Sequence, residues 1–301
     1  MWLALQDYLR QNPLIAWSIP IYAFLISLEV FLSQYEGRRY YTWREALMNL
    51  WLNVANTLLG LSIKVFVMGI LFFGFHHALF SLSHSPVYWA TLALLLDACF
   101  YFEHRAEHTV RVLWAVHVTH HSSTEFNLST GFRSSVLRPF VSCWFFLPLA
   151  FFGFHPLDIL LVDAVCQIYG IVVHTRYIQR MPAWFEAIFV SPSHHRVHHA
   201  RNIPYLDKNM GMVLIVWDKL FGTFQAEMPH EVPEYGITKQ PSHPHHPVRI
   251  ITHEWEALAH DLRQEKITWS QRISYLFMPP GWRHDGKGET TKHLQSGSGK
   301  A

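Results

Sequence analysis

Three clusters of histidine in this chain have the spacing of metal ligands. They are H-x-x-x-H at residues 104–108, H-x-x-H-H at 117–121 and H-x-x-H-H at 195–199. On a helix, side chains at positions i, i+3 and i+4 share one face, so each cluster presents its imidazoles together. The clusters supply eight imidazoles, which is too many for one four-coordinate zinc ion and suits two metal ions that share a site.

Chance and surface exposure are the plain alternatives for so many histidines. The chain has 22 histidines in 301 residues, so some ligand-like spacings arise without a metal site. Three clusters together nevertheless favour metal binding over a solvated histidine-rich face. Imidazole suits zinc, copper, iron and nickel, so ligand type does not choose the metal. A further group, His243, His245 and His246, lies between prolines and is predicted to be a solvated loop.

The composition indicates a membrane protein. Half of the residues are hydrophobic and 15% are charged, against about 25% in soluble proteins. The net charge of +2 is too small to indicate a nucleic-acid partner, and the chain has no nucleic-acid-binding motif. Its three cysteines, Cys99, Cys143 and Cys166, lie in apolar stretches without CxxC spacing, so they are predicted to be small buried hydrophobes.

Five apolar runs must position the histidines: residues 13–32, 50–75, 87–102, 139–154 and 157–173. The first is long enough to span a bilayer, whereas the last two are either short crossings or a hairpin that dips into the membrane. We therefore predict an all-α integral membrane helical bundle with about four to five membrane segments. Residues 1–285 are predicted to form one domain, with a histidine-box core at about 95–225, and residues 286–301 a disordered tail.

Arginine placement predicts the orientation in the membrane. Loops 36–45, 103–138 and 174–210 carry arginine and are expected on the cytoplasmic side, whereas connector 76–86 has none. The histidine boxes and the C-terminus are then cytoplasmic, where a lipid chain in the bilayer can reach the boxes. Residues 181–285 are expected to form a helical cap over them. Within it, Trp184, Phe185, Ile188 and Phe189 fit either an interfacial helix or a core helix of the cap.

The motifs between residues 95 and 225 together resemble the fatty acid hydroxylase/sterol desaturase superfamily. They are DxxFYxxHRxxH from residue 97, LWxxHxxHHSS from 113, PSHHRVHH from 192, DKN from 207 and WDKLFGT from 217. The segments NLSTGFR from residue 127 and PPGW from residue 279 look more like the alkylglycerol monooxygenase branch. The resemblance implies a membrane-bound non-haem di-iron enzyme that uses O2 to attack a lipid C–H bond.

The resemblance also implies the metal ligands. It adds His174, which follows the fifth apolar run, to the eight histidines of the boxes. His194, beside His195, points off the ligand face and is a candidate to support a ligand from outside. The implied iron ligands are His104, His108, His117, His120, His121, His174, His195, His198 and His199.

Several polar residues are candidates to orient these imidazoles through the second ring nitrogen. The main ones are Asp97, Glu107 and Asn127, and the wider set adds Glu125, Asp207 and Asn209. An ordinary salt bridge or helix cap is an equally good interpretation of each acid. Asp97 is favoured because an ionisable residue within an apolar run is costly and usually functional. Three arginines are expected to pair with lipid phosphates or with these acids: Arg105, Arg133 and Arg196.

The leading functional prediction is a di-iron lipid hydroxylase or monooxygenase that acts on a fatty acyl, sterol or alkylglycerol type of substrate. The chain has no haem or flavin motif, so the reductant must be external. The resemblance implies a reduced pterin or a ferredoxin- or cytochrome-type donor protein. A desaturase would use the same site, and a metal-transport or metal-storage membrane protein is the alternative from another class. The clustering of the boxes at one end of the apolar runs argues against transport.

Overall fold

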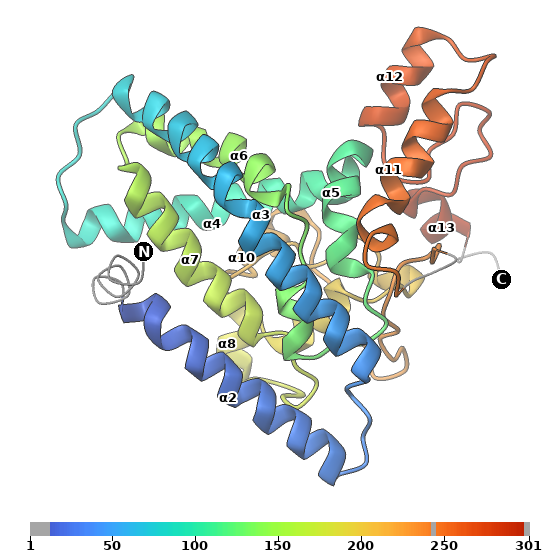
Figure 1. Cartoon of the computed structure of the whole chain (residues 1–301), viewed down its shortest axis with the longest axis horizontal. Coiled ribbons are helices and arrows are strands. Elements are labelled where there is room, and N and C mark those ends of the chain that lie inside the picture. Colours follow the sequence, from blue (N-terminus) through green and yellow to red (C-terminus); the bar gives the residue numbers. More distant parts are fainter. Residues whose placement is uncertain (1–12, 242–244, 298–301) are drawn as a thin grey trace.

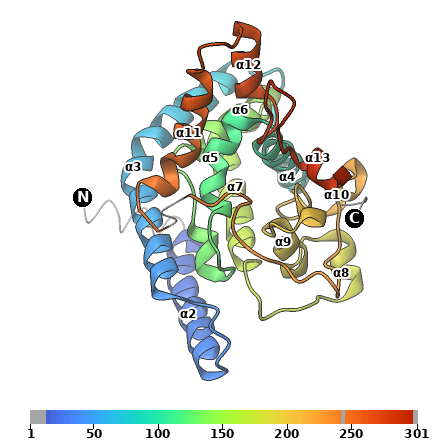
Figure 2. The ribbon, with the colours of Figure 1, turned by 90° about the vertical axis from the view of Figure 1, so that its right-hand side faces the viewer.

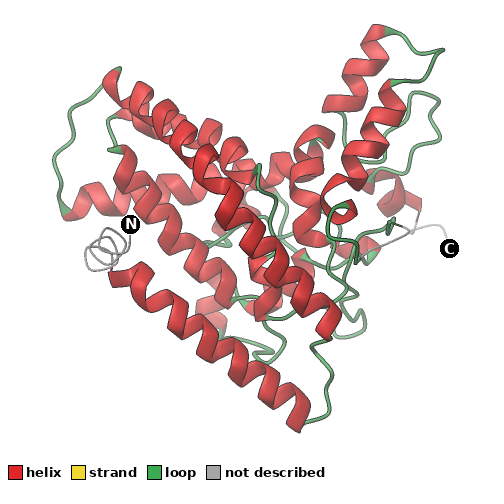
Figure 3. Ribbon diagram, viewed as in Figure 1, coloured by secondary structure: helices red, strands yellow, loops and turns green. Residues whose placement is uncertain are grey.

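A computed structural model describes residues 13–241 and 245–297 of the chain. Within these ranges the chain is helical, and extended pairing is limited to the isolated bridges Phe189–Leu214 and Ala200–Tyr235 (Figure 3). The all-α prediction is therefore confirmed.

Five long helices form one arm of the molecule (Figure 1). They are α2 (Pro13–Tyr35), α3 (Trp43–His76), α4 (Pro86–Thr109), α6 (Arg138–Phe152) and α7 (Pro156–Val172). Helix α3 packs along α6, and α4 packs against both α6 and α7. Local sequence sets the helix starts, because Thr42 and Ser85 cap the first turns of α3 and α4 with their side chains.

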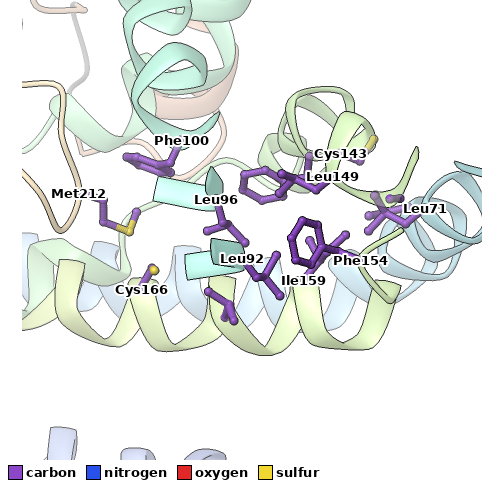
Figure 4. Close-up of a cluster of buried hydrophobic side chains, with 14 of the residues drawn as sticks. Leu71, Leu92, Leu96, Phe100, Cys143, Leu149, Phe154, Ile159, Cys166 and Met212 are labelled. Carbon is purple, nitrogen blue, oxygen red and sulfur yellow. The ribbon is translucent and has the colours of Figure 1, made fainter. Parts of the chain in front are cut away.

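The core of this bundle lies between α3, α4, α6 and α7 (Figure 4). Leu92 and Leu96 of α4 are fully buried against Ile159 of α7 and Leu149 of α6. Cys143 and Cys166 are buried in the same cluster, as predicted, and Cys99 is half-buried and packs against it.

A tight turn joins α6 to α7. Gly153 ends α6 with a left-handed backbone at φ +108°, and its hydrogen atoms face the carbonyl of Phe80 in the α3–α4 connector. A Cβ at this position would collide with that carbonyl, so both the conformation and the close approach require glycine.

Membrane-spanning character is weaker in the structure than the apolar runs suggest. Among the described residues, no single helix meets the length and hydropathy of a span. The two halves of α3, Trp43–Gly60 and Ser62–His76, meet them together but are bent by 54° relative to each other. The number of membrane segments therefore stays a prediction.

Most of the remaining elements lie near the C-terminal ends of α4 and α7 (Figure 2). The remaining elements are α5 (Arg111–His121), η1 (Leu128–Phe132), α8 (Ala183–Ile188), α9 (Pro192–His198), η2 (Ile203–Tyr205), α10 (Val216–Phe221), α11 (Arg249–Leu262), α12 (Trp269–Phe277) and α13 (Thr291–Gly297). Helices α11 and α12 pack against each other and against α5. Leu258, Ile267 and Tyr275 form the small core of this hairpin.

The predicted disordered tail, residues 286–301, differs from the structure in its described part. Helix α13 forms there, and the Gln295 side chain donates to the carbonyls of Ile203 and Leu206 at 3.2 and 3.1 Å. These contacts come from a segment some ninety residues away, so the composition of the tail could not reveal them. Residues 298–301, and His243 of the proline-flanked loop, lie outside the described residues.

Candidate metal centre

The structure brings the nine predicted histidine ligands into two neighbouring groups. Within each group, one ring nitrogen per residue lies within 4.8 Å of those of the other members. The five-histidine group is His104, His108, His117, His121 and His198, and the four-histidine group is His120, His174, His195 and His199.

Adjacent histidines in the sequence belong to different groups. His120 and His121 follow each other on α5, and His198 and His199 follow each other at the end of α9. Consecutive residues on a helix point about 100° apart, since a turn takes 3.6 residues. Each H-x-x-H-H box therefore gives its i and i+4 residues to one group and the remaining histidine to the other.

The Nε2 atoms converge at the spacing of ligands on one ion. In the five-histidine group, the Nε2 atom of His117 lies 3.1 Å from that of His104 and 3.0 Å from that of His121. In the four-histidine group, the three Nε2 atoms of His174, His195 and His199 are separated by 3.0–3.2 Å. Two nitrogens that each bind one ion at about 2.0–2.1 Å lie about 3 Å apart, so each group fits one metal ion.

Two further nitrogens support this fit. The Nε2 atoms of His108 and His198 are buried and have no hydrogen-bond partner within the described residues. Buried polar atoms without a partner are rare in proteins and need an explanation. Both atoms belong to the five-histidine group, where a metal ion would satisfy them.

Backbone carbonyls orient four of the imidazoles. The Nδ1 atoms of His104 and His120 donate to the carbonyls of Met210 and Arg133 at 2.7 and 2.8 Å. Those of His174 and His198 donate to the carbonyls of Gly170 and Lys208 at 2.7 and 2.9 Å. A proton on Nδ1 leaves Nε2 free to bind a metal. Every residue type has a backbone carbonyl, so the sequence could not identify these four hydrogen-bond partners.

Two carboxylates lie beside ring nitrogens. Asp207 accepts a hydrogen bond from Nδ1 of His108 at 3.1 Å. Glu107 Oε2 lies 2.9 Å from Nδ1 of His117, although the two atoms are not aligned for a hydrogen bond. Glu107 was among the main candidates and Asp207 only in the wider set.

Asp97 and Asn127 contact none of the nine imidazoles through a hydrogen bond in the described structure. Asp97 accepts from the backbone N–H groups of Val213 and Leu214 and from the indole of Trp217, at 2.9–3.1 Å. It therefore fixes the segment whose carbonyl at Met210 holds His104. The position of Asp97 inside an apolar run predicted a functional carboxylate that orients an imidazole. In the structure this carboxylate instead accepts hydrogen bonds from the segment that follows Met210.

Asn127, Glu125 and Asn209 also act at a distance from the imidazoles. Asn127 caps η1 and donates to the carbonyl of Tyr40 at 2.8 Å, and Glu125 accepts from the backbone N–H of Thr42. Asn209 donates to the carbonyl of His194 at 3.0 Å. These residues hold the loops that carry the boxes.

His194 lies outside both groups. Its Nδ1 accepts the backbone N–H of Ser191 at 3.2 Å, which closes a capping box at the start of α9. Its contribution is therefore to the helix that carries the third box.

The predicted arginines pair with protein groups. Arg133 is fully buried and donates to Glu45 at 2.6 Å and to Asn49 at 3.0 Å. Arg196 donates to Glu227 at 2.7 Å. Arg105 lies on α4 next to Tyr101, whose hydroxyl it reaches at 3.4 Å.

Burial favours the neutral form of His121, His198 and His199. It is the largest cause that lowers the pKa of His121, His198 and His199 well below the ordinary value, and the neighbouring imidazoles lower it further. Metal binding needs the neutral form of the ring, so the site is prepared for it at neutral pH.

Two cavities flank the histidines. A cavity of about 420 Å³, the cap-side cavity, is lined by His108, His121, His198 and His199 together with Trp114 and Trp282. A cavity of about 100 Å³, the bundle-side cavity, is lined by His104, His117, His120, His174 and His195 together with Phe100, Ile171 and Met212. Each of the nine imidazoles faces one cavity or the other, so the centre is a layer with access from both sides.

A helical fold that holds nine imidazoles in two adjacent groups defines a class of protein with room for two neighbouring metal ions. Residues 89–223, which contain every one of these histidines, match the fatty acid hydroxylase family. This part of the chain belongs to that family.

Relatives with assigned names agree with this placement. Human alkylglycerol monooxygenase is 38% identical over 214 residues, which are 69% of this chain and 45% of the relative. The Xenopus tropicalis protein of the same name is 35% identical over 66% of this chain and 43% of the relative. Ornithine lipid hydroxylase OlsE of Rhizobium tropici is 29% identical over 54% of this chain and 50% of its own length. The chain thus matches less than half the length of the alkylglycerol monooxygenases. No solved structure matches it.

Proposed function

We propose that the chain is a membrane-bound non-haem di-iron oxygenase that uses O2 and an external reductant to hydroxylate a lipid. The interleaving of His120 with His121, and of His198 with His199, is the observation that carries this proposal. It places two ligand sets side by side, as a reaction that needs two metal ions requires. The family match and the relatives, which are named as monooxygenases and a hydroxylase, support iron and oxygen chemistry.

Two iron ions would supply O2 activation, and the chain's own residues hold and isolate them. The five-histidine group and the four-histidine group each offer enough nitrogens for one ion. All ligands are imidazoles, so the centre carries no ligand carboxylate into a buried site. The carbonyls of Met210, Arg133, Gly170 and Lys208 keep four ligand rings in the productive orientation.

The bundle-side cavity is the proposed place for the lipid carbon that is attacked. Phe100, Ile171 and Met212 give it apolar walls, and His104, His117 and His120 give it access to both groups. It lies against α4 and α7, the helices predicted to enter the membrane. An alkylglycerol type of substrate has the strongest support among fatty acyl, sterol and alkylglycerol lipids, because the relatives at 35–38% identity carry that name.

The cap-side cavity is the proposed entry for the reductant. Its volume of about 420 Å³ admits a small molecule such as a reduced pterin, but it does not admit a protein. Trp114 and Trp282 offer ring faces, and Arg111, held by Glu254 and Asp261 at 2.9 and 2.6 Å, offers fixed charge. A ferredoxin- or cytochrome-type donor would instead have to deliver electrons from the surface above this cavity.

The proposal includes a single domain of residues 1–285 in the membrane. The histidine groups and the C-terminus lie on the cytoplasmic side, in keeping with the arginine-bearing loops. Exposed apolar side chains along α2 and α3, such as Phe24, Phe31, Leu58 and Val65, support a lipid environment for these helices.

Metal content and turnover together test the proposal. The purified chain is expected to contain about two irons, because each group fits one ion. With a labelled alkylglycerol it should consume O2 and form an oxygenated product in the presence of a reduced pterin. His121→Ala, compared with the wild type, should lose iron and turnover together.

Other outcomes point to other functions. A desaturase would give an unsaturated product without added oxygen from the same centre. Metal flux in vesicles, without oxidation of any lipid, would replace the proposal with metal transport.

A further inference from the structure

Helices α8 and α10 form one unit although they are distant in sequence. The backbone N–H of Val190 donates to the carbonyl of Val213 at 2.8 Å, and that of Ile215 donates to the carbonyl of Ile188 at 3.0 Å. The Lys219 ammonium donates to the carbonyls of Glu186 and Ala187 at 3.2 and 2.7 Å, which closes the end of α8. These hydrogen bonds join the two short helices.

This unit presents apolar side chains to the outside. On α8, Trp184 and Ile188 are 67% and 45% exposed. On α10, Val216 and Leu220 are 41% and 66% exposed. Each pair has i, i+4 spacing and so shares one helix face. We call these four residues, with Phe221 and Phe102, the α8–α10 surface. Contiguous exposed apolar side chains mark an interaction site.

The surface continues the apolar flank of α4. The ring of Phe221 lies 5.4 Å from that of Tyr101 and 5.2 Å from that of Phe102, which is itself 44% exposed. Leu95, exposed at 37%, lies two helical turns earlier on the same face of α4. The outer face of the bundle therefore passes without interruption onto α10.

Basic residues border the surface, and the acids of the same segments are turned inward. Arg105 follows Phe102 by one turn of α4, and Lys219 is exposed on α10. Asp218 is buried and accepts from the backbone N–H groups of Met210 and Gly211. Glu186 accepts from the hydroxyl of Ser191. An apolar face with a basic border suits the headgroup region of a membrane that contains anionic lipids.

We propose that the α8–α10 surface lies in the headgroup region of a bilayer and presents lipids to the metal centre. The inference rests on the proposed function, because it names where the lipid meets the enzyme. The same segment links the two, since Asp97 holds Val213, Leu214 and Trp217 while the carbonyl at Met210 holds His104. Figure 2 shows α8 and α10 on the side of the molecule away from α3. One side of the molecule thus combines the membrane contact with the third histidine box on α9.

Site-specific photocrosslinking tests this placement on the full chain. A benzophenone amino acid is placed at Ile188 or Leu220, and the protein is reconstituted in vesicles of phosphatidylcholine and phosphatidylglycerol that carry a labelled phospholipid. The control position is Val232, which is apolar and 70% exposed but lies outside this surface. Several-fold more label is expected at both test positions than at Val232. Equal labelling at the three positions, or crosslinks to protein alone, would overturn the proposal.

The outcome is independent of catalysis. The same crosslinks are expected in the His121→Ala background, because the surface does not include a metal ligand. If the wild type lacks iron and turnover but the crosslinks form, the proposed function fails and the membrane contact stands. If turnover is present and labelling is equal at all positions, the membrane contact fails and the function stands.

A charge substitution gives a second readout. Leu220→Glu places a carboxylate at the centre of the surface and should raise the KM for a vesicle-embedded lipid several-fold. The KM for the same lipid in detergent micelles should stay unchanged, and so should iron content. Val232→Glu, at the exposed apolar position outside the surface, is the matched control. A change in kcat and iron content without the vesicle-specific KM effect would contradict the proposal.

Discussion

The imidazole of His121 stacks on that of His199 with ring centroids 4.5 Å apart, although the two residues belong to different histidine groups. The ring of His120 lies at the same distance from His199 on another side. The two groups are therefore in direct contact through the rings of His120 and His121 on α5 and His199 at the end of α9, which we call the shared wall. A change at this wall is expected to disturb both metal sites.

Substitution of one ligand at the shared wall should lower the iron content of both metal sites. His121→Ala deletes a five-histidine ligand and the ring on which His199 stacks, so iron per chain should fall well below half. Turnover should be lost as well. Elemental analysis of protein purified in detergent measures the stoichiometry. His260→Ala is the control, since this histidine has an 84% exposed side chain and lies outside both groups. If His260→Ala loses as much iron as His121→Ala, the grouping is wrong.

The contact between Asp207 and His108 should set metal affinity. Asp207 has a left-handed backbone at φ +55°, which asparagine tolerates, so Asp207→Asn removes the charge with little backbone strain. Loss of a carboxylate that orients a ligand imidazole lowers metal affinity by about 10–100-fold. Competition with a chelator measures this change. The same result from Glu231→Gln, an acid bonded to Asn202 away from the imidazoles, would show that the effect is not specific.

Much of the metal centre could be predicted from the sequence. Eight of the nine imidazoles were predicted from i, i+3 and i+4 spacing on helices, which is a local property, and His174 was predicted only from the family resemblance. The division into two groups needs the relative positions of α4, α5 and α9, which are tertiary. The partner of Asp97 could not be read either, because Val213 and Leu214 lie more than a hundred residues away. The sequence indicated that burying that carboxylate costs free energy, but it did not indicate which hydrogen-bond donors offset this cost.

The buried pair of Arg133 and Glu45 should control stability. Both side chains are buried, and the carbonyl of Arg133 also orients His120. Removing one partner of a buried ion pair costs about 3–5 kcal/mol because the other charge stays unpaired. Glu45→Ala should therefore lower the Tm markedly and loosen metal binding. The comparison is Asp285→Asn, which breaks an exposed pair with Arg283 and should leave the Tm unchanged. Equal Tm values for the two variants would contradict the role of the buried pair.

The free energy of unfolding of the metal-free protein should decrease as the pH is lowered. Burial lowers the pKa of His121 and His199 in the folded state, so the unfolded chain binds more protons below its own histidine pKa. Stability is then present above about pH 6.5 and is lost as pH falls, by up to about 1.4 kcal/mol per histidine for each pH unit. Thermal unfolding between pH 7.5 and 5.5 measures the slope. His121→Ala should reduce it, whereas His260→Ala, at a side chain that is 84% exposed, should not. A slope that ignores the loss of His121 would exclude the buried imidazoles as its cause.

The tryptophan of the cap-side cavity should affect the reductant and not the metal. The ring of Trp282 packs edge-on against Tyr275 at 5.2 Å and lines the cavity that also contains His121 and His198. Trp282→Ala removes a ring face from this wall, so the KM for a small reductant such as a reduced pterin should rise several-fold while iron content stays constant. Trp269→Ala is the matched control, because that ring is 81% exposed on α12 and lies outside the cavity lining. If a protein donor supports turnover and Trp282→Ala leaves the kinetics of both donors unchanged, the cavity does not receive the reductant. Electrons would then have to enter from the surface above this cavity.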